Sequence, residues 1–187
     1  MCPPDNAVVL SVDEKPSIQA LERAQGYLKL PTGRAMTGQS HDYKRNGTTT
    51  LFAALDVGSG QVLGKHYRRR LEFLDFMNRV VKQHEGMEIH VILDNLSTHK
   101  PKRDMWLARH PNVQFHYTPT HSSWLNQIEI WFSILTGKSL KGASFRSVPE
   151  LVAHIQSFIA DYNDDAHPFV WTKSVVHQKR LRPCFAV

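Results

Sequence analysis

Three carboxylates in the sequence stand where metal-dependent phosphodiester chemistry would need them. Asp13 and Asp94 each follow a short apolar run, "AVVLSV" and "EIHVIL", of the kind that forms a buried strand. Ligands of open α/β sheets gather where strands end, so the two acidic side chains are expected to lie together if their strands are neighbours. Like charges so placed require a cation.

The third carboxylate, Glu129, belongs to the stretch "HSSWLNQIEIWF", residues 121–132. On a helix that turns about 100° per residue, the apolar side chains of this region form one arc: Trp124, Leu125, Ile128, Trp131, Phe132 and Leu135. Glu129 falls just past the Leu125 edge of that arc, at the margin of the expected core. A carboxylate there is either a shielded surface charge or a group aimed into a cleft, and the helical pattern leaves both open.

Two aspartates and a glutamate are a set of hard oxygen ligands suited to Mg²⁺, which needs few carboxylates when a phosphate completes its shell. Two such ions roughly 4 Å apart can activate the attacking oxygen and stabilise the leaving oxygen of a phosphodiester transfer. Each residue also has a structural interpretation on its own. These interpretations are a turn for Asp94, a polar strand end for Asp13 and Glu14, a surface helix position for Glu129, a hairpin turn for Asp56 in "LDVGSG", and a cap of the next helix, in place of a phosphate contact, for His99.

The composition narrows the class of protein. A chain of 187 residues with 41% apolar and 21% charged residues indicates one soluble globular domain. The 23 Lys and Arg against 17 Asp and Glu favour a polyanionic partner such as nucleic acid. Cys2 and Cys184 offer no disulfide framework or clustered zinc site, and no segment predicts secretion or a membrane span. We therefore expect a cytoplasmic protein with no membrane partner.

The elements that must position the carboxylates follow from the apolar periodicity. Residues 7–12 predict a strand, residues 15–47 a long functional loop with a short helix, and residues 48–57 and 61–68 a hairpin. A helix, strand, helix and strand are expected at 71–84, 88–95, 102–110 and 113–119, with parallel pairing of the last two strands, and two helices at 121–135 and 148–163. Tryptophans 106, 124, 131 and 171 are expected in the core, and "YRRR" at 67–70 is either a solvated edge or a phosphate contact. The fold class predicted is α/β, a mixed sheet that begins as a meander and is covered by helices.

Five stretches carry a likeness to a known family: "SVDEKPSIQALER", "HDYKRNGTTTLFAALD", "VILDNLSTHK", "PTHSSWLNQIEIWFS" and "DYNDDAHPFVWTK". Together, from about residue 8 to 174, they resemble the catalytic domain of DDE transposases, in the bacterial insertion-sequence branch of the mariner-like superfamily. The resemblance implies a single ribonuclease H-like domain with a five-stranded mixed sheet. It also implies a metal-binding catalytic triad of Asp13, Asp94 and Glu129, supported nearby by Glu14, Asn95, His99 and Asn126.

The resemblance further implies a reaction and its partners. The domain would cut DNA at transposon ends and transfer the freed strand into target DNA at TA dinucleotides, using two Mg²⁺ ions or Mn²⁺, as a homodimer on DNA in the bacterial nucleoid. TA steps are easily deformed, which helps their selection. The loop at 15–47 corresponds to an insertion that contacts DNA or the partner subunit. Phosphate contacts are expected from Arg23, Lys29, Arg34, Lys44, Arg45 and Lys100.

Two features depart from the family pattern. Only twelve residues precede Asp13, where relatives carry helix-turn-helix DNA-binding modules, so that region is expected to be absent or supplied by a separate chain. The tail at 175–187 diverges after "FVWTK". Two alternatives therefore stand beside the transposase hypothesis: a nuclease of the same fold that only hydrolyses nucleic acid, and a catalytically idle DNA-binding remnant.

Overall fold

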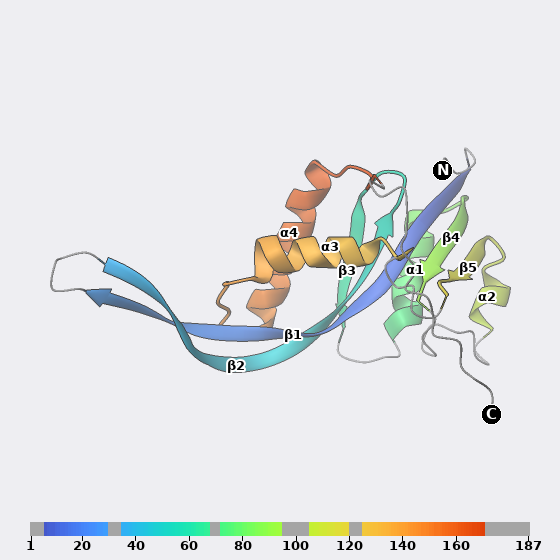
Figure 1. Cartoon of the computed structure of the whole chain (residues 1–187). Coiled ribbons are helices and arrows are strands. Elements are labelled where there is room, and N and C mark those ends of the chain that lie inside the picture. Colours follow the sequence, from blue (N-terminus) through green and yellow to red (C-terminus); the bar gives the residue numbers. More distant parts are fainter. Residues whose placement is uncertain (1–5, 30–34, 68–71, 95–104, 120–124, 171–187) are drawn as a thin grey trace, which may run out of the picture.

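The strands form one mixed sheet. In the computed structural model, which describes residues 6–29, 35–67, 72–94, 105–119 and 125–170, its order is β3-β2-β1-β4-β5 (Figure 1). β1 pairs antiparallel with β2 and β2 antiparallel with β3, whereas β1–β4 and β4–β5 are parallel. The bounds are Ala7–Lys29 for β1, Ala35–Asp56 for β2, Val62–Tyr67 for β3, Glu88–Leu93 for β4 and Val113–Tyr117 for β5. The predicted mixed sheet, its opening meander and its parallel pair are confirmed.

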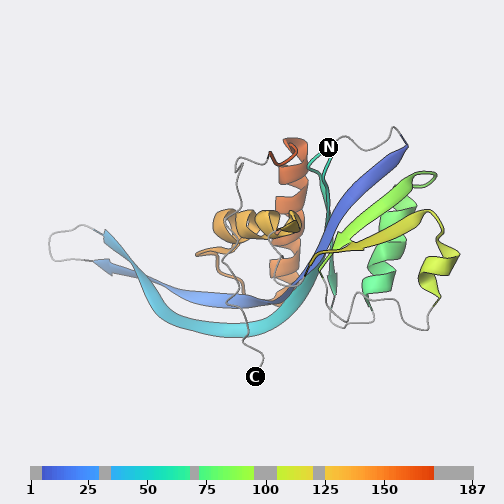
Figure 2. The ribbon, with the colours of Figure 1, turned by 45° about the vertical axis from the view of Figure 1, so that its right-hand side comes forward.

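Helices lie on both sides of this sheet, α1 and α2 on one side and α3 and α4 on the other (Figure 2). Their bounds are Phe73–Gln83 for α1, Trp106–Arg109 for α2, Ile128–Leu135 for α3 and Val148–Asp164 for α4, with a π-helical turn, η3, at Thr136–Leu140. The N-cap of α4 is Ser147, whose hydroxyl accepts a hydrogen bond from the Glu150 amide. In the described part of the chain, no helix is long and apolar enough to cross a bilayer.

Each side of the sheet has its own apolar core. The first contains Phe76, Met77 and Val80 of α1 packed on alternate residues of β1 and β4. The second contains Ile128 and Trp131 of α3, together with α4, packed on β2 and β3. Because successive residues of a strand point to opposite faces, β1 contributes to both sides. Trp106 and Trp131 are buried as predicted, while tryptophans 124 and 171 lie outside the described residues.

The prediction of a long loop with a short helix at 15–47 is wrong. β1 continues to Lys29 and β2 begins at Ala35, so the two strands form a long, curved hairpin that projects from the body (Figure 1). We call its outer part, residues 18–29 and 35–49, the arm. Three register shifts interrupt the pairing, the first between Lys15 and Ile18, where Pro16 has no amide to donate. Backbone hydrogen bonds between the two polar strands hold them together. Pairing of this kind leaves no pattern that could be recognised within either segment of the sequence alone.

Asp56 stabilises the turn between β2 and β3, as the structural interpretation of this residue predicted. Its carboxylate accepts hydrogen bonds from the Gly58 amide, at 2.8 Å, and from the Ser59 hydroxyl, also at 2.8 Å. An aspartate that binds the backbone two residues ahead stabilises a turn. Asp56 therefore belongs to the hairpin and not to the candidate site.

Candidate metal and DNA-binding site

Asp13 and Asp94 lie at matching positions on two neighbouring strands. The parallel register pairs Ser11 of β1 with Ile92 of β4, and each aspartate follows two residues later. Asp13 is only 6% exposed, and Asp94 is half-buried directly after β4. The prediction that Asp13 ends its strand is wrong, because β1 continues; what ends there is its pairing with β4. β4 itself ends at Leu93, so both aspartates come just after the last paired residues of β1 and β4.

Two N–H groups orient the Asp13 carboxylate. The Glu14 amide donates to its Oδ1 at 2.7 Å, and the side-chain amide of Asn126 lies 3.5 Å from its Oδ2. Asp13 pairs with Ala53 of β2, whose side chain belongs to the core under α3 and α4. Glu14 pairs with Phe52, whose ring lies in the opposite core, so the side chains of Asp13 and Glu14 point to different faces. Only Asp13 therefore faces the side of the sheet that carries α3.

Glu129 sits in the first turn of α3 and is exposed. The start of that helix is attached to β1 beside Asp13, because the Ile128 amide donates to the Ser11 hydroxyl at 2.9 Å. In the described residues, however, no three His, Cys, Asp or Glu side chains gather closely enough to hold an ion. The structure thus brings the backbone of Glu129 to the site and places its carboxylate outside a ready-made cluster.

The residues predicted to support the triad have different outcomes. Asn126 is fully buried and contacts both the Val12 carbonyl, at 3.1 Å, and Asp13. Asn95, His99 and Lys100 lie outside the described residues. Ser11 is also fully buried at the site. The sequence patterns did not single it out, because it lies within the apolar run "AVVLSV". Its only sequence signal is a hydroxyl at an inward-facing position of the strand.

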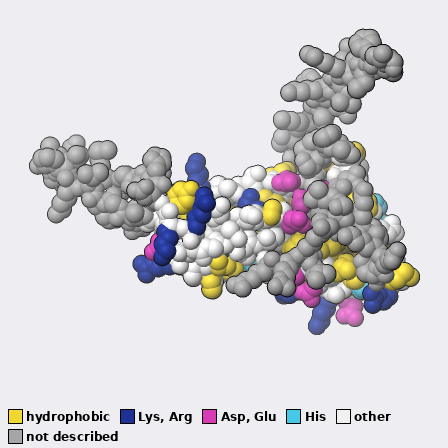
Figure 3. Space-filling view, turned by 90° about the horizontal axis from the view of Figure 1, so that it is seen from below, with side chains coloured by type: hydrophobic (Ala, Val, Ile, Leu, Met, Phe, Trp, Pro, Cys, Tyr) yellow, Lys and Arg dark blue, Asp and Glu magenta, His cyan; other side chains and the backbone are white. Residues whose placement is uncertain are grey.

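Among the basic residues predicted to contact DNA, Lys44 and Arg45 of the arm are exposed. Figure 3 shows Lys and Arg side chains gathered on one face of the molecule near the end of the arm. The Lys44 ammonium lies 3.8 Å from the Glu22 carboxylate, and the Arg45 guanidinium lies over the half-exposed ring of Tyr43. Arg23 has a structural role, since its amide donates to Ser144 and its guanidinium to the Ala143 carbonyl.

Two further arm positions were predicted to contact DNA. Lys29 pairs with Ala35 at the end of β1, and Arg34 lies outside the described residues.

A pair of histidines on β4 and β5 was missed by the sequence patterns. His90 Nδ1 and His116 Nε2 are 2.9 Å apart and their rings are stacked, while the Glu88 carboxylate lies 3.5 Å from His90 Nε2. By alternation from Ile92, His90 occupies the same face of the sheet as Asp94. The sequence signal that could have found this pair is the alternation of Glu88 and His90 with apolar residues in "EIHVIL".

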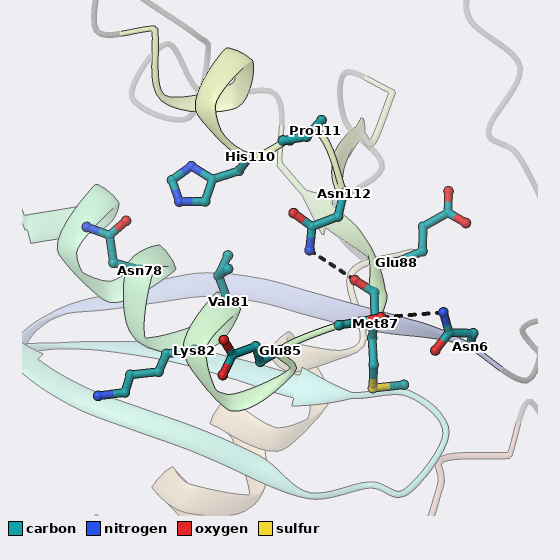
Figure 4. A pocket seen from close by; sticks show the side chains of 11 residues that line it. Asn6, Asn78, Val81, Lys82, Glu85, Met87, Glu88, His110, Pro111 and Asn112 are labelled. Carbon is teal, nitrogen blue, oxygen red and sulfur yellow. Dashed lines mark hydrogen bonds between the residues drawn. The ribbon is translucent and has the colours of Figure 1, made fainter.

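A pocket of about 820 Å³ lies at the other end of the parallel strands, between the end of α1 and the loop after α2 (Figure 4). The amide side chains that line it make hydrogen bonds within the fold. Asn112 donates to the Met87 carbonyl and Asn6 to the Gly86 carbonyl. Asn78 accepts from the Trp106 indole. The pocket is lined at the start of β4, whereas Asp94 follows its end. It is therefore separate from the carboxylates.

Comparisons with known proteins agree with this arrangement. Three solved structures share the fold: a Mos1 transposase paired-end complex with left transposon end, a Mos1 mariner paired-end complex with Mn, and a pre-cleavage Mos1 transpososome. Their TM-scores are 0.58, 0.54 and 0.55, their identities 14%, 14% and 13%, and they cover 81%, 83% and 87% of this chain. The chain covers 47%, 48% and 49% of theirs, about half their length. Likeness at this identity shows the ribonuclease H-like fold.

The comparison of sequences is more direct about the family. No curated protein matched the chain. The family described as DDE superfamily endonuclease matches residues 8–152, a range that includes all three candidate carboxylates and most of the sheet. The match covers well over half of the 187 residues. The chain belongs to the DDE superfamily endonucleases.

Proposed function

We propose that this chain is the catalytic domain of a transposase, which cleaves DNA at transposon ends and transfers the cut strand into target DNA. One observation carries the proposal: in a DDE superfamily chain, Asp13 and Asp94 occupy matching positions on parallel strands, and the helix bearing Glu129 is bonded to the same strand as Asp13. The related Mos1 structures include complexes with a transposon end and a strand transfer complex. Those complexes were formed by Mos1, and they support the proposal of a corresponding activity for this chain.

The donor set fits a hard divalent cation. Asp13 is a buried carboxylate oriented by two N–H groups, Asp94 occupies the matching position directly after the neighbouring strand, and DDE endonucleases use divalent metal ions. We assign Asp13, Asp94 and Glu129 as the residues that would hold two ions, Mg²⁺ or Mn²⁺. Bound there, the ions would supply Lewis-acid stabilisation of the reacting phosphate. The chain itself contributes the fixed position of Asp13 and a helix start from which Glu129 can reach inward.

The arm supplies a surface for phosphates. Lys44 and Arg45 are exposed on it, and attraction of such groups to the DNA backbone is independent of base sequence. We propose that the arm contacts DNA or a second subunit of a homodimer, that target joining occurs at TA, and that helix-turn-helix modules read the transposon end. The 187 residues alone are then expected to bind DNA weakly, with a strong salt dependence and almost no preference for end sequence over scrambled duplex.

Strand joining is the activity that separates a transposase from a nuclease. The purified chain, with and without a helix-turn-helix module added, should be incubated with a labelled duplex ending in the element's terminal sequence, supercoiled plasmid, and Mg²⁺ or Mn²⁺. Covalent transfer of label to the plasmid, abolished by EDTA, is the expected result. Metal-dependent nicking without joining in both preparations would instead identify a hydrolytic nuclease, and absence of nicking would identify a catalytically idle remnant.

A further inference from the structure

A closed hydrogen-bond network joins the start of α3 to β1. Ser11 and Asn126 are polar, yet both are 0% exposed and the surrounding side chains of this face are apolar. The Ser11 hydroxyl donates to Asn126 Oδ1 and accepts from the Ile128 amide at 2.9 Å. Asn126 Nδ2 donates to the Val12 carbonyl at 3.1 Å and points its other N–H toward Asp13 Oδ2, at 3.5 Å. The donors of both side chains, and at least one acceptor lone pair of each, are therefore engaged.

This network replaces a missing helix cap. The first amides of a helix have no partner within the helix, and a side chain at the N-cap usually accepts from one of them. The N-cap of α3 is Gln127, which makes no such bond. Ser11, from a strand more than a hundred residues earlier, accepts from the Ile128 amide instead. The helix consequently begins at a position set by β1.

The same bonds tie the two ends of the candidate metal site together. Ser11 lies two residues before Asp13, and Ile128 immediately precedes Glu129. Asn126, two residues before Ile128, adds to this link because it contacts Ser11, Val12 and Asp13 of β1. Apolar side chains of similar size would pack the two elements with less directional control, since the hydrophobic effect does not specify direction whereas hydrogen bonds do.

We propose that Ser11 and Asn126 are positioning residues that fix the start of α3 against Asp13, and thereby set where the Glu129 carboxylate can meet the metal. This inference rests on the proposed function. Loss of the Ser11 hydroxyl leaves Asn126 Oδ1 without its donor and the Ile128 amide without its acceptor, so the helix start shifts relative to Asp13. Residues that orient metal ligands typically change metal affinity or activity by about 10- to 100-fold when removed, and we expect a loss in that range.

Matched controls separate positioning from stability. Ser147→Ala removes the cap serine of α4, and Asn163→Ala removes an amide that bonds both the Val62 amide and the Val62 carbonyl, each at 2.8 Å. Both therefore remove hydrogen bonds of the same kinds as Ser11→Ala and Asn126→Ala. They act through α4, away from the contacts of Asp13, and should lower the melting temperature without altering metal binding.

The experiment measures Mn²⁺ binding by calorimetry, the Mn²⁺ concentration for half-maximal DNA nicking, and the melting temperature, all on the full chain. Ser11→Ala and Asn126→Ala should raise the Mn²⁺ Kd and the half-maximal concentration about 10- to 100-fold. The two controls should change either by less than about twofold. Ser11→Cys replaces the hydroxyl by a slightly larger and weaker hydrogen-bonding group and should fall between wild type and Ser11→Ala; it decides the outcome if Ser11→Ala does not fold.

Two results would count against the inference in different ways. A wild-type chain that binds and nicks normally, with Ser11 variants no more affected in Mn²⁺ affinity than Ser147→Ala, overturns the positioning role and leaves the proposed function intact. A wild-type chain that neither binds Mn²⁺ nor nicks DNA, with or without added helix-turn-helix modules, overturns the proposed function and this inference with it.

Discussion

The two faces of the sheet are built differently from the same strand. On the α1 side, β1 contributes Val8, Leu10 and Val12 to a core whose members are all apolar or aromatic. On the α3 side, the intervening positions include Ser11 and Asp13, both buried. Because side chains of a strand alternate between faces, one segment can stabilise the fold on one side and carry polar groups on the other. The α1 core is thus apolar throughout, whereas the α3 side combines an apolar core with the buried polar groups of the candidate site.

Polar burial follows the same division. Three buried side-chain atoms have no hydrogen-bond partner in the described residues: His66 Nε2, Gln127 Oε1 and Trp131 Nε1. Gln127 and Trp131 belong to the start and middle of α3, and His66 pairs with Leu51, which faces α3 and α4. On the α1 side, the Trp106 indole has its partner in Asn78 at 2.7 Å. Buried polar atoms without partners cost stability, so the α3 side is the less optimised face.

The largest expected effect is on cleavage. Asp13→Ala, Asp94→Ala and Glu129→Ala should each reduce metal-dependent nicking to background, because the ions lose a ligand. In the absence of metal, melting temperatures should be equal to wild type or higher, since removal of one like charge relieves repulsion. Gel assays of nicking and metal-free thermal melts make the test. A variant that still nicks at a clear fraction of the wild-type rate would show that its residue is not essential.

Core truncation should produce the opposite pattern. Phe76 on the α1 side is fully buried against Phe52, with ring centroids 5.9 Å apart. Phe76→Ala should lower the free energy of unfolding by about 3–5 kcal/mol. Leu151→Ala, at a fully buried position of α4, should cost about 2–5 kcal/mol. Denaturant titrations measure both, and Mn²⁺ affinity of the folded fraction should stay unchanged; a loss of affinity in Phe76→Ala would contradict the division between the faces.

A smaller effect is expected at the arm. Lys44→Glu combined with Arg45→Glu should weaken DNA binding and lower the slope of log affinity against log salt by about one for each phosphate that is no longer neutralised. Filter binding at several salt concentrations gives both quantities. Arg79→Glu combined with Lys82→Glu, two exposed positions of α1 of which Lys82 lies beside the pocket of Figure 4, is the control with the same change in net charge. Equal reductions in the two proteins would mean that net charge alone, and not the arm, governs binding.

The smallest effect is a pH dependence of stability from the α3 side. Burial lowers the pKa of His66 from 6.5 to about 4, so the folded protein keeps this ring neutral. The unfolded chain takes up the proton first as the pH falls. The contribution of His66 is therefore complete above pH 6.5 and is lost between pH 6.5 and 4, by about 1–2 kcal/mol after allowance for partial exposure.

Replacement of the ring tests this assignment. His66→Gln should flatten the fall in melting temperature between pH 6.5 and 4, whereas His154→Gln, at an exposed position, should leave it unchanged. Thermal melts at half-unit pH intervals measure the difference. An unaltered slope in His66→Gln would show that other groups cause the acid sensitivity.

Local periodicity was enough to predict the parts of the fold that depend on it. The helix expected at 71–84 is α1 at Phe73–Gln83, and the strands around Gly86–Pro119 pair in parallel as expected. These elements carry their own apolar pattern. The arm could not be predicted in this way, because its polar strands are held by pairing with each other. Its alternating buried residues, Ile18 and Ala20, are only two positions within an otherwise polar stretch.

The candidate site divides along the same line. Asp13 and Asp94 could be proposed because each follows an apolar run, and Glu129 because it lies at the margin of the apolar arc of an amphipathic helix. Ser11 could not, since its role depends on Asn126, 115 positions away in the chain. A buried hydroxyl inside an apolar strand has no local sequence feature that distinguishes it from a core position tolerant of small residues. Such long-range polar contacts emerge only from the fold.

Divalent metal held between Asp13, Asp94 and Glu129 on the α3 side of the sheet is the central claim. A crystal of this chain grown with Mn²⁺ tests it through the anomalous difference map. We predict peaks bonded to oxygens of Asp13 and Asp94, at the distances of about 2.1 Å that small hard cations require, with the Glu129 side chain turned inward from the first turn of α3. Peaks located only at His90 and His116, or an occupied Asp13 and Asp94 site with Glu129 still facing solvent, would contradict it.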